Sequence, residues 1–175
     1  MRMIEISGVA AAIVLVAVTT PVHAADKPSD AQIAHVAYTA GDLDIKAAQL
    51  ALKKSKNAEI LAFANDMVRD HQAVNDKALA LVKKLGVTPE DNDTSKGLVK
   101  QSSEKQAELA KLSGPDFDKS YIDNEVAYHK TVDGALQSTL IPSSDNLELK
   151  SLLQTGLKIF TGHLEHAEHL ANALH

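Results

Sequence analysis

The feature that most constrains the fold is an apolar residue at every third or fourth position, sustained over long stretches without proline. Steps that alternate between four and three residues place side chains on one face of an α-helix. Residues 57–85 are therefore predicted to form a long amphipathic helix with an imidazole on its buried face. Its series is Ile60, Ala64, Met67, His71, Val74, Ala78, Leu81 and Leu85.

The same spacing predicts four more helices, separated by turn residues. Gly86 and Pro89 end the helix of residues 57–85, Gly114 and Pro115 end a shorter polar helix, and "IPSSDN" separates the last two. Aromatic residues make up 3% of the chain, and Ala and Leu are its main apolar residues, which favours helices over strands. The fold class is predicted to be all-α, with the further helices at about 30–55, 95–112, 115–140 and 145–173.

The lengths of the connections predict the topology. One or two residues join the helices 30–55 and 57–85, and about five join the helices 115–140 and 145–173, so each pair is expected to be an antiparallel hairpin. A long connection from Gly86 to Pro115 links the hairpins. These features predict a four-helix bundle of two antiparallel hairpins, with a short extra helix in the crossover.

The first 24 residues are typical of a secretory signal peptide. They contain Arg2, an apolar run at residues 9–18, and the small-x-small pattern Val22-His23-Ala24. We expect cleavage after Ala24, a polar leader at 25–29, a single domain at 30–173, and a periplasmic or secreted location with envelope association left open. An uncleaved N-terminal anchor is the alternative. No later segment approaches the roughly 20 apolar residues that span a bilayer, so no transmembrane segment is expected in the mature chain.

Composition excludes several kinds of chemistry and partner. The chain of 175 residues has no cysteine, which rules out disulfides, thiolate metal sites and thiol catalysis. Its formal charge is −5 and its basic residues are scattered, so a nucleic-acid partner is not expected. Any metal chemistry must rest on histidine, methionine and carboxylates.

Each long helix carries an ionisable residue among its core-facing positions. Burying one unpartnered imidazole or carboxylate costs several kcal/mol, a large part of a typical stability of about 5–15 kcal/mol. We therefore expect these groups to converge at mid-bundle and to satisfy one another, directly or through a shared cation. They are Asp44, His71, Glu125, His129 and His163.

Three imidazoles with one or two carboxylates suit a single transition-metal ion, Zn, Cu, Fe or Mn. The alternative is a metal-free network of His–carboxylate pairs that fixes the helix register. Met67 is expected to fill core space, and Asp70 to point into solvent. His166 and His169 are expected on the surface, where Glu165 and His169 would form an alternative second metal site.

Four segments carry a family resemblance: "AGDLDIKAAQLAL", "FANDMVRDH", "FDKSYIDNEVAYHKTV" and "FTGHLEHAEHL". Together they resemble a family of exported bacterial proteins, a domain of unknown function often labelled as outer membrane proteins. The resemblance implies a ferritin-like bundle and recurring histidines at His71, His129 and His163, with Glu usual at the position of Asp44. The Glu-x-x-His pairs of di-iron ferritin-like proteins do not occur at these positions, which disfavours a di-iron centre.

Two functions follow as hypotheses. The first is an exported bundle that binds one metal ion through His71, His129 and His163, with Asp44 or Glu125 completing the ligand set. The second is a non-enzymatic envelope or stress protein with a metal-free polar core, whose surface meets a protein partner. No catalytic residue is predicted, and a hydrolase is disfavoured because no nucleophile-elbow motif occurs.

Overall fold

The structure is a computed structural model that describes residues 27–174, and over this range it is helical without strands. The predicted all-α class is confirmed. The predicted signal peptide and its cleavage site lie outside the described residues. The helices are α1 (Asp30–Lys54), α2 (Ala58–Leu85), α3 (Asp93–Lys111), α4 (Gly114–Ala135), the short α5 (Ile141–Ser143) and α6 (Leu147–Leu174), with a π-helical turn, η1 (Leu136–Leu140), after α4.

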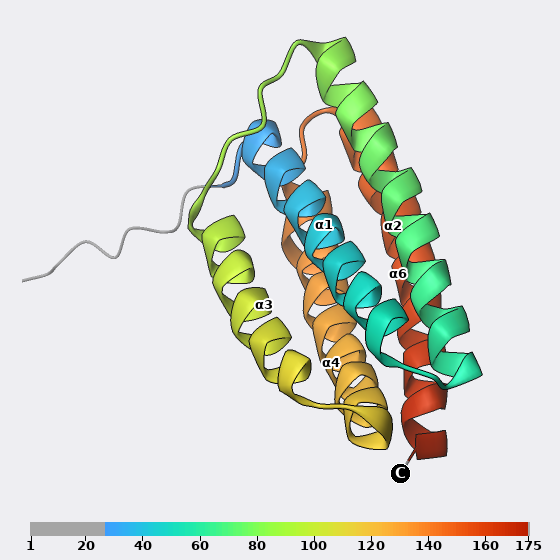
Figure 1. Ribbon diagram of the computed structural model, residues 1–175. Helices are drawn as coiled ribbons and strands as arrows, with labels where there is room; N and C mark the ends of the chain where they lie inside the picture. Colours follow the sequence, from blue (N-terminus) through green and yellow to red (C-terminus); the bar gives the residue numbers. More distant parts are fainter. Residues whose placement is uncertain (1–26, 175) are drawn as a thin grey trace, which may run out of the picture.

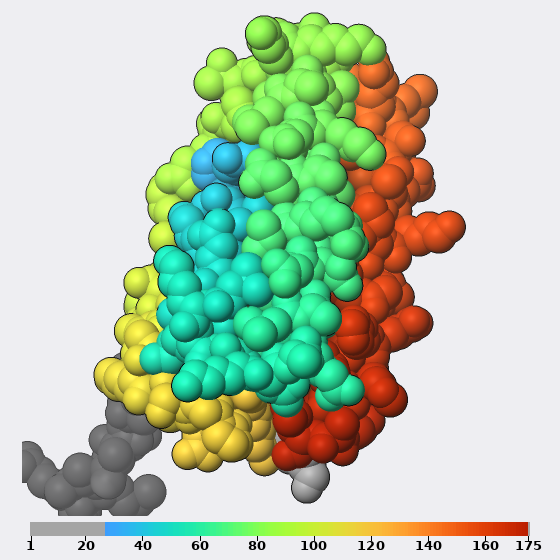
Figure 2. Space-filling model, turned by 45° about the vertical axis from the view of Figure 1, so that its right-hand side comes forward, coloured from blue at the N-terminus to red at the C-terminus, as the bar shows by residue number. Residues whose placement is uncertain are grey.

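Four long helices form the bundle, and α3 lies outside it (Figure 1). α1 and α2 form one antiparallel hairpin, α4 and α6 form the other, and α2 packs against both α1 and α6. Figure 2 shows α2 between α1 and α6 on one face of the molecule. α3 runs back along α1, so that α4 begins at the end of the bundle where α2 began. The predicted pair of hairpins with a helix in the crossover is confirmed.

Local capping fixes where the helices begin and end. Ser29 caps α1 in a capping box with Gln32, and Asn57 caps α2 by accepting from the Glu59 N–H. α2 ends at Gly86, whose φ of 64° lies in the left-handed region that favours glycine. None of the helices among the described residues is long and apolar enough to cross a membrane.

The helix predicted at residues 115–140 corresponds to α4, and the chain continues as a helix beyond residue 140. Its hydrogen bonds widen in η1, where the Ile141 N–H donates to the carbonyl of Leu136, and the chain stays helical to Ser143. Pro142 has no N–H to donate, and a π-helical turn is one way in which a helix accommodates such a gap.

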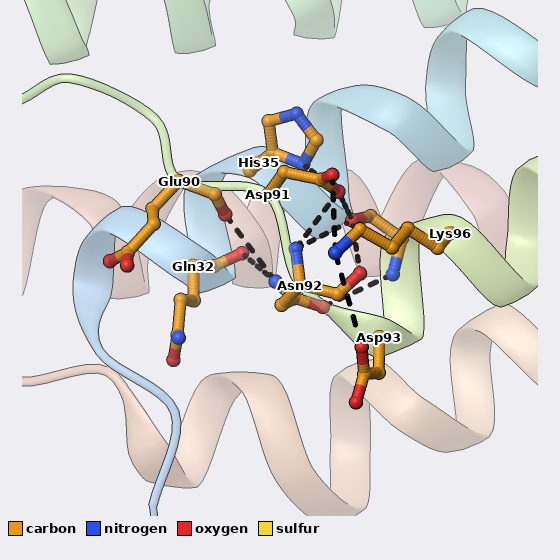
Figure 3. A network of polar contacts seen from close by, with 8 residues as sticks. Gln32, His35, Glu90, Asp91, Asn92, Asp93 and Lys96 are labelled. Carbon is orange, nitrogen blue, oxygen red and sulfur yellow. Dashed lines mark hydrogen bonds and ion pairs between the residues drawn. The ribbon is translucent and has the colours of Figure 1, made fainter.

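A polar network fastens the connection between α2 and α3 to α1 (Figure 3). The Glu90 N–H donates to the carbonyl of Ala31 at 3.1 Å, and Asn92 Nδ2 donates to the carbonyl of Gln32 at 3.4 Å. Asp91 lies 4.0 Å from His35 Nδ1. These contacts hold the start of α3 beside the start of α1.

The core consists of two apolar clusters with polar side chains between them. One cluster, which includes Ala51, Phe63 and Phe117, fills the end of the bundle at the turn between α1 and α2. The other, which includes Ile33 and Leu149, fills the opposite end. On each long helix, the ionisable residues that were predicted to be buried lie between the two apolar clusters. They are Asp44, His71, Glu125, His129 and His163.

Candidate metal centre

The structure brings the five predicted side chains together in one polar cluster at mid-bundle. One ligand atom from each of His71, His129 and His163 lies within 4.8 Å of the other two. The same holds for Asp44, Glu125 and His129, so His129 joins the two groups. All five residues are at most 7% exposed. The expected convergence therefore occurs, while binding of a metal by these residues stays a prediction.

Asp44 on α1 lies close to two imidazoles. Its Oδ2 atom is 2.9 Å from His71 Nε2 and 3.5 Å from His129 Nε2. Yet both carboxylate oxygens of Asp44 and both ring nitrogens of His71 lack a hydrogen-bond partner among the described residues. These oxygen and nitrogen atoms lie close together without well-aligned hydrogen bonds between them. Such an arrangement is typical of metal ligands that point at a common centre.

His129 on α4 and His163 on α6 each have one ring nitrogen occupied and one free. His129 Nδ1 donates to the backbone carbonyl of Glu125 at 3.1 Å, because a carbonyl can only accept. His163 Nε2 donates to Asp70 Oδ2 at 3.1 Å for the same reason. The opposite nitrogens, Nε2 of His129 and Nδ1 of His163, are buried and make no hydrogen bond to any residue that the structure describes. Each neutral ring thus keeps a free lone pair, as a metal-ligating histidine does.

The expectation that Asp70 points into solvent is wrong. Its side chain is 26% exposed and reaches from α2 to His163 on α6, while its other contact is to Arg69. Position 70 lies beside the core-facing position of His71, at the edge of the contact between α2 and α6. A carboxylate at this edge can therefore meet a histidine on the neighbouring helix.

Burial and neighbouring charges determine the protonation of the cluster. Burial alone would raise the pKa of Asp44, but the adjacent His71 and His129 hold that pKa well below its ordinary range. Burial, and to a smaller extent the negative charge of Asp44, raises the pKa of Glu125 well above its ordinary value. Burial lowers the pKa values of His129 and His163. At neutral pH these two imidazoles are therefore uncharged and can act as ligands.

Aromatic rings border the cluster. The Phe160 ring stacks on His71, with centroids 4.3 Å apart and planes inclined by 6°. Met67, one turn before His71, is fully buried in the apolar core, as expected. His166 and His169 are exposed, and His169 with Glu165 joins no group of three or more candidate ligands among the described residues.

Two tyrosines near the cluster were not singled out from the sequence. The Tyr128 hydroxyl donates to the carbonyl of Ala40 at 2.9 Å, whereas the fully buried Tyr121 hydroxyl has no hydrogen-bond partner among the described residues. Burial, together with the charges of Asp44 and Glu125, raises the pKa of both tyrosines well above the ordinary value. The spacing of four residues between Tyr121 and Glu125 is the signal that could have placed this hydroxyl beside the site.

Comparison with known families assigns the chain. The model of the domain of unknown function DUF4142 matches residues 17–170, nearly the whole sequence. The chain belongs to the DUF4142 family. This finding confirms the predicted resemblance to a family defined only as a domain of unknown function. No curated protein matches this DUF4142 chain.

Two solved structures share the fold of this DUF4142 chain. One is titled "CopM in the Cu(II)-bound form"; it is 12% identical, has a TM-score of 0.65, and the match covers 85% of this chain and 99% of that one. The other is a DUF305 fragment from Deinococcus radiodurans, 12% identical, with a TM-score of 0.71 and coverage of 84% and 99%. At this identity the likeness supports the predicted helical-bundle fold and does not assign ligands.

Proposed function

We propose that this protein binds a single transition-metal ion in the polar cluster. His71, His129 and His163 supply nitrogen ligands from three helices, and Asp44 or Glu125 completes the set. We further propose that it does so outside the cytoplasm, in the periplasm or after secretion, because residues 1–24 are typical of a cleaved signal peptide.

One observation carries the proposal: seven buried side-chain atoms of the cluster make no well-aligned hydrogen bond among the described residues, although some lie close together, as Asp44 Oδ2 and His71 Nε2 do at 2.9 Å. Each such atom costs about 1–3 kcal/mol when nothing compensates for it. A cation at the centre would satisfy several of these atoms at once. They are Asp44 Oδ1 and Oδ2, His71 Nδ1 and Nε2, Glu125 Oε2, His129 Nε2 and His163 Nδ1.

The donor set fits the first-row transition metals. Imidazole nitrogen with a carboxylate suits Zn, Cu, Fe or Mn, whereas all-oxygen shells suit Mg and Ca. Asp70 on His163 and the Glu125 carbonyl on His129 are the outer contacts that metal-bound imidazoles usually have. The copper-bound title of the neighbouring CopM structure is compatible with a metal in such a bundle.

Metal content of the exported protein tests the proposal. Full-length protein is expressed and exported in its native host, purified without chelator, and measured by inductively coupled plasma mass spectrometry. We expect about one ion per chain in the wild type and in a His166→Ala/His169→Ala control, whose side chains are exposed. The His71→Ala/His129→Ala variant should lose nearly all of this metal. Equal trace metal in all three proteins would overturn the proposal.

A second candidate is a metal-free polar network that fixes the helix register. The His163–Asp70 hydrogen bond and the 2.9 Å approach of Asp44 to His71 favour it. In this case the protein would act in the envelope through a surface partner, and metal would have no effect on its stability.

A further inference from the structure

An apolar cavity of about 130 Å³ adjoins the polar cluster. It runs between the long helices on the side of the cluster toward the N-terminus of α1, and its walls come mainly from aliphatic and aromatic side chains, among them Ala37, Val74, Val132 and Leu153. At one end it is bounded by Asp44, His71 and His129. The cavity therefore leads to the side of the cluster where three of the proposed ligands lie.

Small residues leave this space open. α1 contributes the three alanines Ala34, Ala37 and Ala40 to the wall. Residues of this size cannot fill the gap between helices whose axes are set by larger side chains elsewhere. A dry apolar cavity of about 150 Å³ in another protein is known to take benzene or xenon. The volume here is close to that size.

A second cavity, of about 210 Å³, reaches the same cluster from beneath α3. Its walls include the polar side chains of Gln101, Ser102, Lys105 and Asn124, and it ends at Asp44 and Glu125. A hydrated ion would be favoured on this more polar side, because a wholly apolar wall cannot replace its water. The two cavities thus favour different kinds of ligand: the first an apolar molecule, and the second a polar or hydrated one.

We propose that the apolar cavity binds a small uncharged molecule, with the size of a gas or of a ring of about six non-hydrogen atoms, beside His71 and His129. The class follows from the wall: away from its end at Asp44, His71 and His129 the cavity is apolar, and a charged molecule there would lose its hydration without gaining a partner. That such a molecule would sit next to a metal ion rests on the proposed function. The cavity itself does not depend on the ion.

Crystals of the full chain, grown once with chelator and once after metal loading, test this inference. They are pressurised with xenon or soaked with benzene, and parallel crystals are soaked with benzoate as a charged probe. We expect xenon in the apolar cavity in both preparations, benzene at the same place, and no benzoate. Xenon alone would restrict the class to gases and still support the inference.

Three substitutions sharpen the test. Ala37→Leu and Val132→Phe should each abolish xenon binding by filling the cavity, while Ala80→Leu, at an exposed position of α2, should leave it unchanged. No xenon in wild-type crystals, benzoate bound as fully as benzene, or xenon retained in both filled variants would overturn the inference. Xenon in the cavity of a chain that binds no metal would contradict only the proposed function, whereas metal without xenon would contradict only this inference.

Discussion

His163 Nε2 donates to Asp70 Oδ2 at 3.1 Å across the contact between α2 and α6, and this bond leaves Nδ1 as the free nitrogen of the ring. Such outer carboxylates orient the ring and raise its basicity, and their loss typically weakens metal binding 10–100-fold. We expect Asp70→Ala to weaken metal affinity by about this factor, measured by competition with a chromophoric chelator.

Asp66→Ala is the matched control for Asp70→Ala. Asp66 also pairs with Arg69 on α2, but it makes no contact with His163. Its loss should leave metal affinity within about twofold of the wild type, since an exposed ion pair contributes little. Equal weakening by both substitutions would show that charge near α2, and not orientation of His163, controls binding.

Removal of the metal should lower the melting temperature. An ion present at 100 times its Kd stabilises the folded state by about 2.7 kcal/mol, which corresponds to roughly 5–10 °C for a chain of this length. Thermal unfolding followed by circular dichroism, with and without chelator, measures the shift. The His71→Ala/His129→Ala variant should show no shift. An unchanged melting temperature in the wild type would favour the metal-free network.

Gly41 permits the close approach of α1 and α2 one turn before Asp44. A Cβ atom at this position would lie 2.5 Å from Oδ1 of Asn75, which is itself buried and donates to the carbonyl of Tyr38. Gly41→Ala should therefore destabilise the fold by about 1–3 kcal/mol in urea unfolding, despite the better helix propensity of alanine. Gly134→Ala, whose Cβ would meet no atom within 4 Å, should instead stabilise it by about 0.5–1 kcal/mol. The same sign for both would contradict this packing.

Asp133 predicts a pH dependence of stability separate from the metal. Burial raises the pKa of Asp133 from 3.8 to about 6, although its Oδ2 atom accepts a hydrogen bond from Thr161 at 3.3 Å. The folded state therefore binds the Asp133 proton more tightly than the unfolded state does. Protonation of Asp133 thus stabilises the fold at low pH, and this contribution is lost as the pH rises from about 4 to about 6.

Replacing Asp133 by asparagine isolates this effect, because asparagine keeps the shape of the protonated carboxyl. Between pH 4 and pH 7, with chelator present, the free energy of unfolding of the wild type should fall relative to that of Asp133→Asn by about 1–3 kcal/mol. Urea unfolding at several pH values measures the difference, in which the other titrating groups cancel. Parallel curves for the two proteins would rule out a proton held by Asp133.

The helices and their buried ionisable residues could be predicted because helical periodicity is local. The spacing of apolar residues alone placed His71 and His163 on buried faces, and the two apolar clusters on either side confirm that placement. Turn residues such as Gly86 gave the helix ends, and connection lengths gave the two hairpins.

Features that depend on how helices face one another could not be predicted. The hydrogen bond between Asp70 and His163 depends on how α2 and α6 are turned about their axes relative to each other. The periodicity of a sequence gives no information on this orientation. The apolar cavity depends on how the small residues of α1 lie relative to the side chains of α4 and α6. The helical path through Pro142 depends on a π-helical turn that has no simple sequence signal. Export and the binding of a metal ion stay predictions.

Anomalous diffraction from crystals of the full chain, loaded with the metal found in the native protein, tests the central claim most directly. Data collected above and below the absorption edge of that metal should give one peak inside the bundle, about 2.0–2.3 Å from a ring nitrogen of each of His71, His129 and His163. A peak only at the exposed His166 and His169, or no peak while the five buried side chains hydrogen-bond to one another, would contradict it.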